Sequence, residues 1–227
     1  MEGKPRLGVL FSGGKDSTLA LYYAQNHSKV SCLITVESSN KESYMFHTPT
    51  IELAKLQAEA LKLPIVIVKT KGEKEAELSD LRRAMKEAKK KYKINGIVTG
   101  AVESVYQTSR IQRIAFELGL ACYSPLWQKP QLELLQELVA KGFIVKITGV
   151  YGEGMEQFYG KTINEDFIKR IRIASEKYKL NPAGEGGEYE SLVLDGPNFH
   201  KRLEIVKSHK KGPANSCTLI VDKVRLR

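Results

Sequence analysis

Residues 7–17 of the chain read LGVLFSGGKDS, an apolar run that ends directly in a pair of glycines. The run at 7–11 has the length and composition of a buried strand, and residues 16–25 have helical spacing. The glycines therefore lie at a strand-to-helix turn, where free backbone N–H groups and the helix dipole favour a bound anion. Because glycine has no side chain, Gly13 and Gly14 let the backbone approach a phosphate closely. The pattern predicts a phosphate site at the start of the first helix, with an ordinary glycine-rich turn as the alternative.

The loop differs from two common phosphate-binding motifs. Lys15 is followed by Asp16, and no glycine lies five residues before Gly14, so the loop is not a Walker A motif. It also lacks the G-x-G-x-x-G spacing of dinucleotide-binding turns. A different class of nucleotide site is therefore expected.

The rest of the first half alternates short β-rich apolar runs with helical patterns. This alternation is typical of βαβ units, and it predicts an α/β fold with a five-stranded parallel sheet. The predicted strands are 7–11, 30–36, 65–69, 97–99 and 121–124, and the predicted helices include 16–25, 50–61 and 109–118.

The pattern changes after Pro125. A helix is predicted at 130–140 with Gly142 at its C-terminal end, a strand at 143–150, and a helix that Asn164 caps and that runs to about residue 178. Three alternating runs follow, which predicts an antiparallel sheet and a smaller α+β region. These runs span 189–194, 201–208 and 216–226. We expect two domains, 1–128 and 129–227.

Lys and Arg total 36 and Asp and Glu total 26, which gives a formal net charge of +10. That charge suits nucleic acid, a nucleotide or an acidic protein surface, and surplus lysine also keeps proteins soluble. No apolar run approaches the ~20 residues that span a bilayer, and glycines interrupt the N-terminal region before a signal-peptide core develops. We expect a cytoplasmic protein with no membrane partner.

A long helix before the fourth strand carries part of this charge. Leu78, Leu81, Met85, Ala88 and Tyr92 recur at spacings of three and four, which predicts one apolar stripe. The other face carries Arg82, Arg83, Lys86, Lys89, Lys90, Lys91 and Lys93. Such a face is typically solvated, and a patch that contacts protein or RNA is the alternative.

The cysteines argue against metal and disulfide chemistry. Cys32, Cys122 and Cys217 lie about 90 residues apart, with no C-x-x-C pair and no histidine at ligand spacing. The four histidines are equally scattered. We expect buried, reduced thiols and no site built on histidine.

The loop from Ser12 to Ser17 resembles the PP-loop of the ATP pyrophosphatases, S-G-G-x-D-S, which binds the β- and γ-phosphates of ATP. The resemblance implies that Ser12, Gly13, Gly14 and Ser17 bind pyrophosphate. Lys15 occupies the variable position, where its charge can still help the phosphates. Asp16 would approach Mg²⁺, because a carboxylate beside phosphates needs a cation between them.

Four further segments narrow the resemblance to the diphthine–ammonia ligase family, a PP-loop branch that makes the final amide of diphthamide on elongation factor 2. They read YMFHT (44–48), GAVESVYQTSR (100–110), PLW (125–127) and GEGGEYES (184–191). The family implies a Rossmann-like (HUP-type) sheet. Longer members carry extra C-terminal domains, and this chain is expected to be the short, archaeal-type form without them. Nothing in the chain resembles a glutaminase, so free ammonium is the expected nitrogen source.

The implied reaction joins a substrate carboxylate to AMP, releases pyrophosphate, and lets ammonia displace the AMP. Arg110 is the candidate for neutralising charge near the α-phosphate, and a surface arginine is the alternative. Gly100 and His47 are expected to line the nucleotide site, although His47 could be an ordinary loop residue. Tyr106 and Gln107 are expected to contact the substrate or to close their loop.

The acidic cluster Glu185, Glu188 and Glu190 needs a cation, which ammonium or the trimethylammonium group of diphthine would supply. We expect Glu185 and Glu188 to face the substrate, and Glu190 to share a strand face with Glu188. Tyr189, Tyr106 or Trp127 could form an aromatic wall for the quaternary cation. One glutamate could also take a proton from ammonium. The alternative is a glycine-rich hairpin with solvated glutamates.

Two other functions remain open from the sequence. A PP-loop enzyme that modifies tRNA would suit the +10 charge, although the cysteine pair of such enzymes is missing. A non-catalytic nucleotide sensor is the other, although it would not need Asp16 and the glutamates. In the leading interpretation nucleic acid is not required, and a homo-oligomer is possible.

Overall fold

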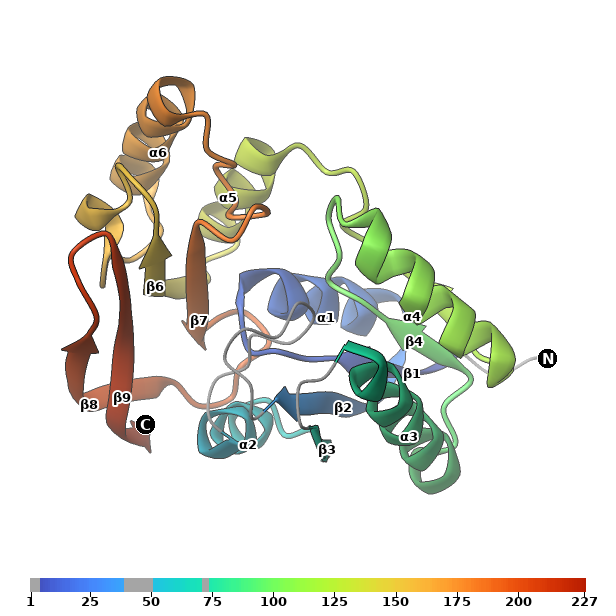
Figure 1. Ribbon diagram of the computed structural model, residues 1–227. Coiled ribbons are helices and arrows are strands. Elements are labelled where there is room, and N and C mark those ends of the chain that lie inside the picture. The colour runs from blue at the N-terminus through green and yellow to red at the C-terminus, as the bar shows by residue number, and fades with distance from the viewer. Residues whose placement is uncertain (1–4, 39–50, 71–73) are drawn as a thin grey trace. The chain divides into compact units, whose positions relative to one another are not determined.

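The computed structural model describes residues 5–38, 51–70 and 74–227. The chain divides into two compact units, Met1–Trp127 (unit 1) and Gln128–Arg227 (unit 2). Figure 1 shows the elements of both units in chain order.

Unit 1 is built on five parallel strands, as predicted. In the sheet they follow the order β3-β2-β1-β4-β5, and every neighbouring pair is parallel. The strands β2 and β3 are thus added on one side of β1, and β4 and β5 on its other side, so the strand order switches between β1 and β4. Ligands of open α/β sheets bind at such a switch point, beyond the carboxyl ends of the strands. The strands are β1 (Arg6–Leu10), β2 (Lys29–Ser38), β3 (Ile65–Thr70), β4 (Gly96–Val98) and β5 (Ala121–Tyr123).

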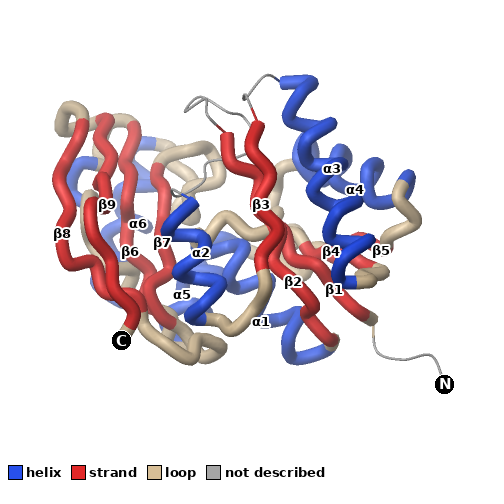
Figure 2. The backbone as a smooth tube through the Cα atoms, turned by 90° about the horizontal axis from the view of Figure 1, so that it is seen from below, coloured by secondary structure: helices blue, strands red, loops and turns tan. Residues whose placement is uncertain are grey.

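Helices cover both faces of this sheet. Figure 2 shows α3 (Lys74–Tyr92) and α4 (Val105–Glu117) on one side, and α1 (Lys15–His27) and α2 (Ile51–Ala60) on the other. The apolar stripe predicted for α3 is buried against the sheet together with one side of α4, since Leu81, Met85, Ile111 and Ile114 lie in one core cluster with residues of β2 and β4.

Helix α4 begins four residues earlier than the sequence pattern predicts. Ser104 caps it, because its Oγ accepts a hydrogen bond from the backbone N–H of Gln107. The segment that was expected to be a loop is therefore helical, and Tyr106 and Gln107 lie in its first turn.

Unit 2 is an antiparallel sheet with two α-helices, which confirms the predicted α+β architecture. Its strands follow the order β7-β6-β9-β8. The elements are α5 (Gln131–Ala140), β6 (Ile144–Tyr151), the 3-10 turn η1 (Glu156–Phe158), α6 (Glu165–Tyr178), β7 (Tyr189–Asp195), β8 (Leu203–Lys211) and β9 (Ser216–Leu226). Asn164 caps α6 as predicted, with its Oδ1 accepting from the Phe167 N–H at 2.9 Å.

The thiols are free in the structure, and the cysteines Cys32 and Cys217 are buried. Burial raises the pKa of Cys32 to about 12, so this thiol stays protonated at neutral pH. No helix within the described residues is both long and apolar enough to cross a bilayer.

The two isoleucines near the middle of α6 should differ sharply in their contribution to stability. Ile171 is fully buried, whereas Ile173 is 66% exposed on the same helix. Ile171→Ala is expected to lower the free energy of unfolding by about 2–5 kcal/mol through lost burial and a new cavity, and Ile173→Ala to change it by less than about 0.5 kcal/mol. Urea denaturation of both variants measures the difference, and equal effects would contradict this packing of α6.

Candidate active site

The glycine loop lies where β1 meets α1, beside the switch point of the sheet. After β1, the Phe11 N–H donates to the Ile34 carbonyl at 2.8 Å, and the Thr35 hydroxyl donates to the Phe11 carbonyl at 2.7 Å. Gly14 is the N-cap of α1 and supplies no side-chain cap. The first N–H groups of an α-helix have no acceptor within the helix itself, so this end of α1 suits the anion that the sequence predicts.

Two serines and a glycine shape the loop. The Ser12 and Ser17 hydroxyl oxygens lie 3.1 Å apart, and the Ser17 hydroxyl donates to the Gly14 carbonyl at 3.2 Å. Gly13 has φ of +78°, a left-handed conformation that L side chains rarely adopt, and a Cβ here would lie 2.1 Å from Oε1 of Gln57. Gln57 also donates to the Gly13 carbonyl at 2.9 Å. Gln57 on α2 thus supports the glycine loop. The sequence does not predict this contact, because Gln57 lies 44 residues after Gly13.

Gly100 brings the loop after β4 against the start of α1. A Cβ at Gly100 would lie 2.7 Å from the Ser17 backbone nitrogen and 2.8 Å from the Asp16 carbonyl carbon. Both contacts are with backbone, so a side chain at this position would force the two segments apart. The structure therefore brings Gly100 and the glycine loop together, as the sequence analysis expects of residues in one site.

Asp16 and Lys15 form an ion pair at the start of α1. The Lys15 ammonium is buried and lies 2.8 Å from Oδ2 of Asp16. Oδ1 of Asp16 is buried and has no hydrogen-bond partner in the described part of the chain. A buried carboxylate oxygen of this kind fits a Mg²⁺ ligand. Within the described residues no cluster of three or more His, Cys, Asp or Glu could hold a metal ion.

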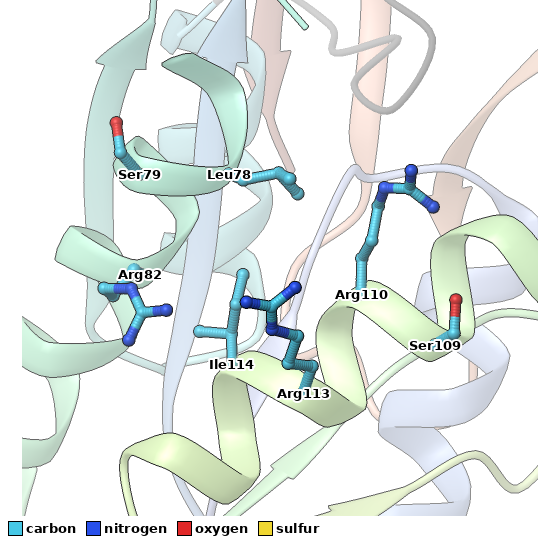
Figure 3. Close-up of a pocket in the computed structure, with 7 residues that line it drawn as sticks. All are labelled: Leu78, Ser79, Arg82, Ser109, Arg110, Arg113 and Ile114. Carbon is cyan, nitrogen blue, oxygen red and sulfur yellow. The ribbon is translucent and has the colours of Figure 1, made fainter. Parts of the chain in front are cut away.

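The first two turns of α4 carry Tyr106, Gln107 and Arg110. The Arg110 guanidinium carbon lies 3.4 Å from the centre of the Tyr106 ring, and its Nη1 donates to the Tyr106 carbonyl at 3.2 Å. The guanidinium therefore lies over the Tyr106 ring in a cation–π contact. Arg110 also lines a pocket of about 500 Å³ between α3 and α4, shown in Figure 3.

Trp127 lines a second pocket of unit 1, of about 410 Å³, beside α4 and β5. Thr108 and Ser124 contribute to the same pocket, and their hydroxyl oxygens are buried without a hydrogen-bond partner in the described part of the chain. His47 and the neighbouring segment 44–48 fall outside the described residues.

In unit 2 the carboxylate of Glu188 is engaged by its own loop. Oε1 accepts from the backbone N–H and the side-chain amide of Asn181, both at 2.7 Å, and Oε2 accepts from the Gly186 N–H at 2.8 Å. Strand β7 begins at Tyr189, so Glu188 lies one residue before the strand whose alternation was predicted to place it on one face with Glu190. Glu188 instead turns back into the loop and holds its shape.

Tyr189 packs into the core of unit 2. Its ring makes an edge contact with Phe167, with ring centroids 6.1 Å apart, and its hydroxyl donates to the Pro182 carbonyl at 2.9 Å. Its side of the strand faces helix α6, so these contacts favour a structural role over the predicted aromatic wall for a cation.

Glu190 lies on the other face of the sheet, in a polar cluster that the sequence did not reveal. Its strand partner is Gly149, where a Cβ would lie 2.7 Å from the Tyr151 hydroxyl and 3.2 Å from Oε2 of Glu190. The Tyr151 hydroxyl is also 3.2 Å from the Thr218 hydroxyl. Burial, and more weakly the Glu190 carboxylate, raise the pKa of Tyr151, so its phenol stays a hydrogen-bond donor. Glu185 is half-buried in the loop before β7.

Comparison with known proteins covers both units. The Diphthamide synthase N-terminal domain matches residues 5–122, and the Diphthamide synthase C-terminal domain matches residues 130–226. The diphthine–ammonia ligases of Mus musculus and Homo sapiens are 32% and 31% identical to this chain, over 89% of it and 84% of their own length. The Schizosaccharomyces pombe enzyme of the same name is 32% identical over 89% of this chain but only 37% of its own length.

Among solved structures, a predicted subunit of tRNA methyltransferase from Methanocaldococcus jannaschii covers 85% of this chain and 98% of its own, with 17% identity and a TM-score of 0.48. That likeness is too distant to bear on function. The two domain matches, in contrast, follow one another along the chain, and the mammalian relatives align over most of their length. The chain therefore belongs to the diphthine–ammonia ligase (diphthamide synthase) family of ATP-dependent ligases.

Proposed function

We propose that the protein amidates the diphthine carboxylate of elongation factor 2 with ammonium, at the expense of ATP converted to AMP and pyrophosphate. Family membership supports the reaction type. The observation that carries the proposal is the glycine loop at the switch point, where α1 begins without a side-chain cap and where Gly13 and Gly100 leave no room for a Cβ. Such a site binds a pyrophosphate group without needing a Walker A lysine.

In the first step a diphthine carboxylate oxygen bonds to the α-phosphorus, and the bond from that phosphorus to the bridging oxygen breaks. Negative charge then collects on the departing pyrophosphate, which the N–H groups of the loop and the hydroxyls of Ser12 and Ser17 stabilise. Asp16 would hold Mg²⁺, whose charge offsets that of the phosphates. Arg110, fixed on the Tyr106 ring, supplies a positive charge for the α-phosphate.

In the second step ammonia attacks the acyl carbon and AMP leaves. Ammonium must first be bound and must then lose a proton to become ammonia. A carboxylate can do both, because its negative charge binds the cation and its oxygen accepts the proton. Glu190 fits this task better than Glu188, because the Glu188 carboxylate already accepts three hydrogen bonds from its loop. Tyr151 donates to Glu190 and orients it on the face away from the core.

Substitution of Asp16 tests its predicted part in holding the cation. Asp16→Asn is expected to raise the Mg²⁺ concentration that half-saturates ATP binding by about tenfold, because an amide oxygen does not balance the charge of the cation. Affinity for ATP without Mg²⁺ should stay the same or rise, since an anion beside the phosphates is removed. Calorimetric titrations at several Mg²⁺ concentrations measure both quantities.

The control for this titration is Asp80→Asn, which removes a carboxylate that pairs with Arg83 on α3. It should leave the Mg²⁺ dependence unchanged. An equal loss of affinity with and without Mg²⁺ in Asp16→Asn would assign Asp16 to folding of the loop instead.

The proposed reaction is tested by incubating the chain with ATP, Mg²⁺, ammonium and diphthine-bearing elongation factor 2. We expect AMP, pyrophosphate and amide in equal amounts by chromatography and mass spectrometry. Glu190→Gln should slow amide formation by about 10²-fold or more and raise the ammonium requirement, with little change in thermal stability. Glu188→Gln should destabilise unit 2 by about 1–3 kcal/mol, because a side-chain amide N–H would face a backbone donor.

Release of ADP and phosphate would contradict the proposed function, as would consumption of tRNA with no change in elongation factor 2. Full activity of Glu190→Gln would remove this residue from the mechanism while leaving the reaction itself in place.

A further inference from the structure

A pocket of about 500 Å³ lies between α3 and α4 on one face of unit 1 (Figure 3). We call it the α3–α4 groove. Both helices begin after carboxyl ends of strands, α3 after β3 and α4 after β4, so the groove opens along the edge of the sheet that carries the glycine loop. It is lined by Leu78, Ser79 and Arg82 from α3, and by Ser109, Arg110, Arg113 and Ile114 from α4.

The groove holds more positive charge than its own carboxylate can balance. Figure 3 shows Arg82 and Arg113 reaching toward one another from the two helices. Both bind the carboxylate of Glu117, which lies one turn beyond Arg113. Each guanidinium has five N–H donors, whereas a carboxylate has only two oxygens, so donors remain for a ligand. Arg110 adds a third guanidinium group to the lining of the groove.

The ion pairs of Glu117 indicate that the arginines of the groove bind carboxylates. Its carboxylate bridges the two arginines, and their hydrogen bonds hold its pKa below the ordinary value for glutamate. The ligand best suited to the remaining donors is another carboxylate, which an arginine can bind through two parallel hydrogen bonds. Leu78 and Ile114 add an apolar wall that can pack against the methylenes of glutamate.

The positive surface continues along α3 beyond the pocket. Lys86 and Lys89 follow Arg82 by one and two turns and are exposed, and the Lys89 ammonium donates to the Leu118 carbonyl at the end of α4 at 2.5 Å. An extended ligand would therefore meet cations over several turns. These residues belong to the lysine- and arginine-rich face of α3, for which the sequence allowed either a solvated surface or a patch that contacts a partner.

We propose that the α3–α4 groove docks an acidic segment of the protein substrate, a proposal that rests on the proposed function. A protein substrate is much larger than its reacting side chain and needs a binding surface outside the reaction site. RNA is the less suitable occupant, because the residues that line the groove include no aromatic ring on which a base could stack.

The test is the double substitution Arg82→Gln/Arg113→Gln in the full chain, with steady-state kinetics of amide formation. The concentration of elongation factor 2 at half-maximal rate should rise about tenfold or more at low salt, while kcat and the KM values for ATP and ammonium stay within about twofold. Added salt should weaken binding of the unsubstituted protein and affect the variant much less, because screening acts on the charges that the variant lacks. Arg82→Lys/Arg113→Lys should restore a large part of the affinity.

Arg170→Gln/Arg172→Gln removes the same charge from α6 and serves as the control, with no expected change in KM. If the first double variant fails to fold, Ser79→Glu places a repelling carboxylate in the groove without touching the Glu117 ion pairs.

An unchanged KM for elongation factor 2 in an active, folded groove variant would overturn the docking proposal and leave the proposed function standing. Loss of binding to a labelled RNA, with KM for the factor unchanged, would overturn it in favour of RNA. Absence of amide formation by the unsubstituted protein would instead refute the proposed function.

Discussion

The close backbone approach between Gly100 and the first turn of α1 is the constraint on which the proposed nucleotide site depends. Parallel pairing of β1 with β4 places the loop after β4 beside the glycine loop, and the missing side chain at Gly100 lets the two backbones meet. Gly13 likewise has no room for a Cβ, because the Gln57 side chain fills that space. Sheet order and glycine position together therefore bring the two loops to the start of α1, where the end of a helix can stabilise phosphate charge.

Two carboxylates of unit 2, Glu188 and Glu190, have different surroundings. Glu188 closes a glycine-rich loop by accepting hydrogen bonds from Asn181 and Gly186, and Tyr189 anchors the same loop to α6 through Phe167 and Pro182. The next residue, Glu190, points to the opposite face of the sheet, where its carboxylate accepts a hydrogen bond from the Tyr151 hydroxyl. The structural residues and the proposed reactive carboxylate are thus neighbours in sequence.

Sequence reasoning predicted the parallel sheet, the antiparallel sheet and the loop at the start of α1, because strand and helix periodicity and glycine position are local signals. It placed the start of α4 too late, since the Ser104 cap depends on a backbone bond to Gln107 that composition does not reveal. It assigned Glu188 to the substrate because an acidic cluster needs a cation, whereas in the structure the Glu188 carboxylate accepts hydrogen bonds from its own loop. Gln57 and Tyr151 were missed because their contacts join distant segments, and only the fold brings those segments together.

The central claim is that the substrate carboxylate is activated by transfer to the α-phosphorus of ATP. It is tested most directly by following oxygen-18 from a labelled diphthine carboxylate of elongation factor 2 into the nucleotide product. Attack on the α-phosphorus predicts one labelled oxygen in each AMP released, because the carbon–oxygen bond breaks when ammonia displaces AMP. Unlabelled AMP, or label in inorganic phosphate with release of ADP, would contradict the account.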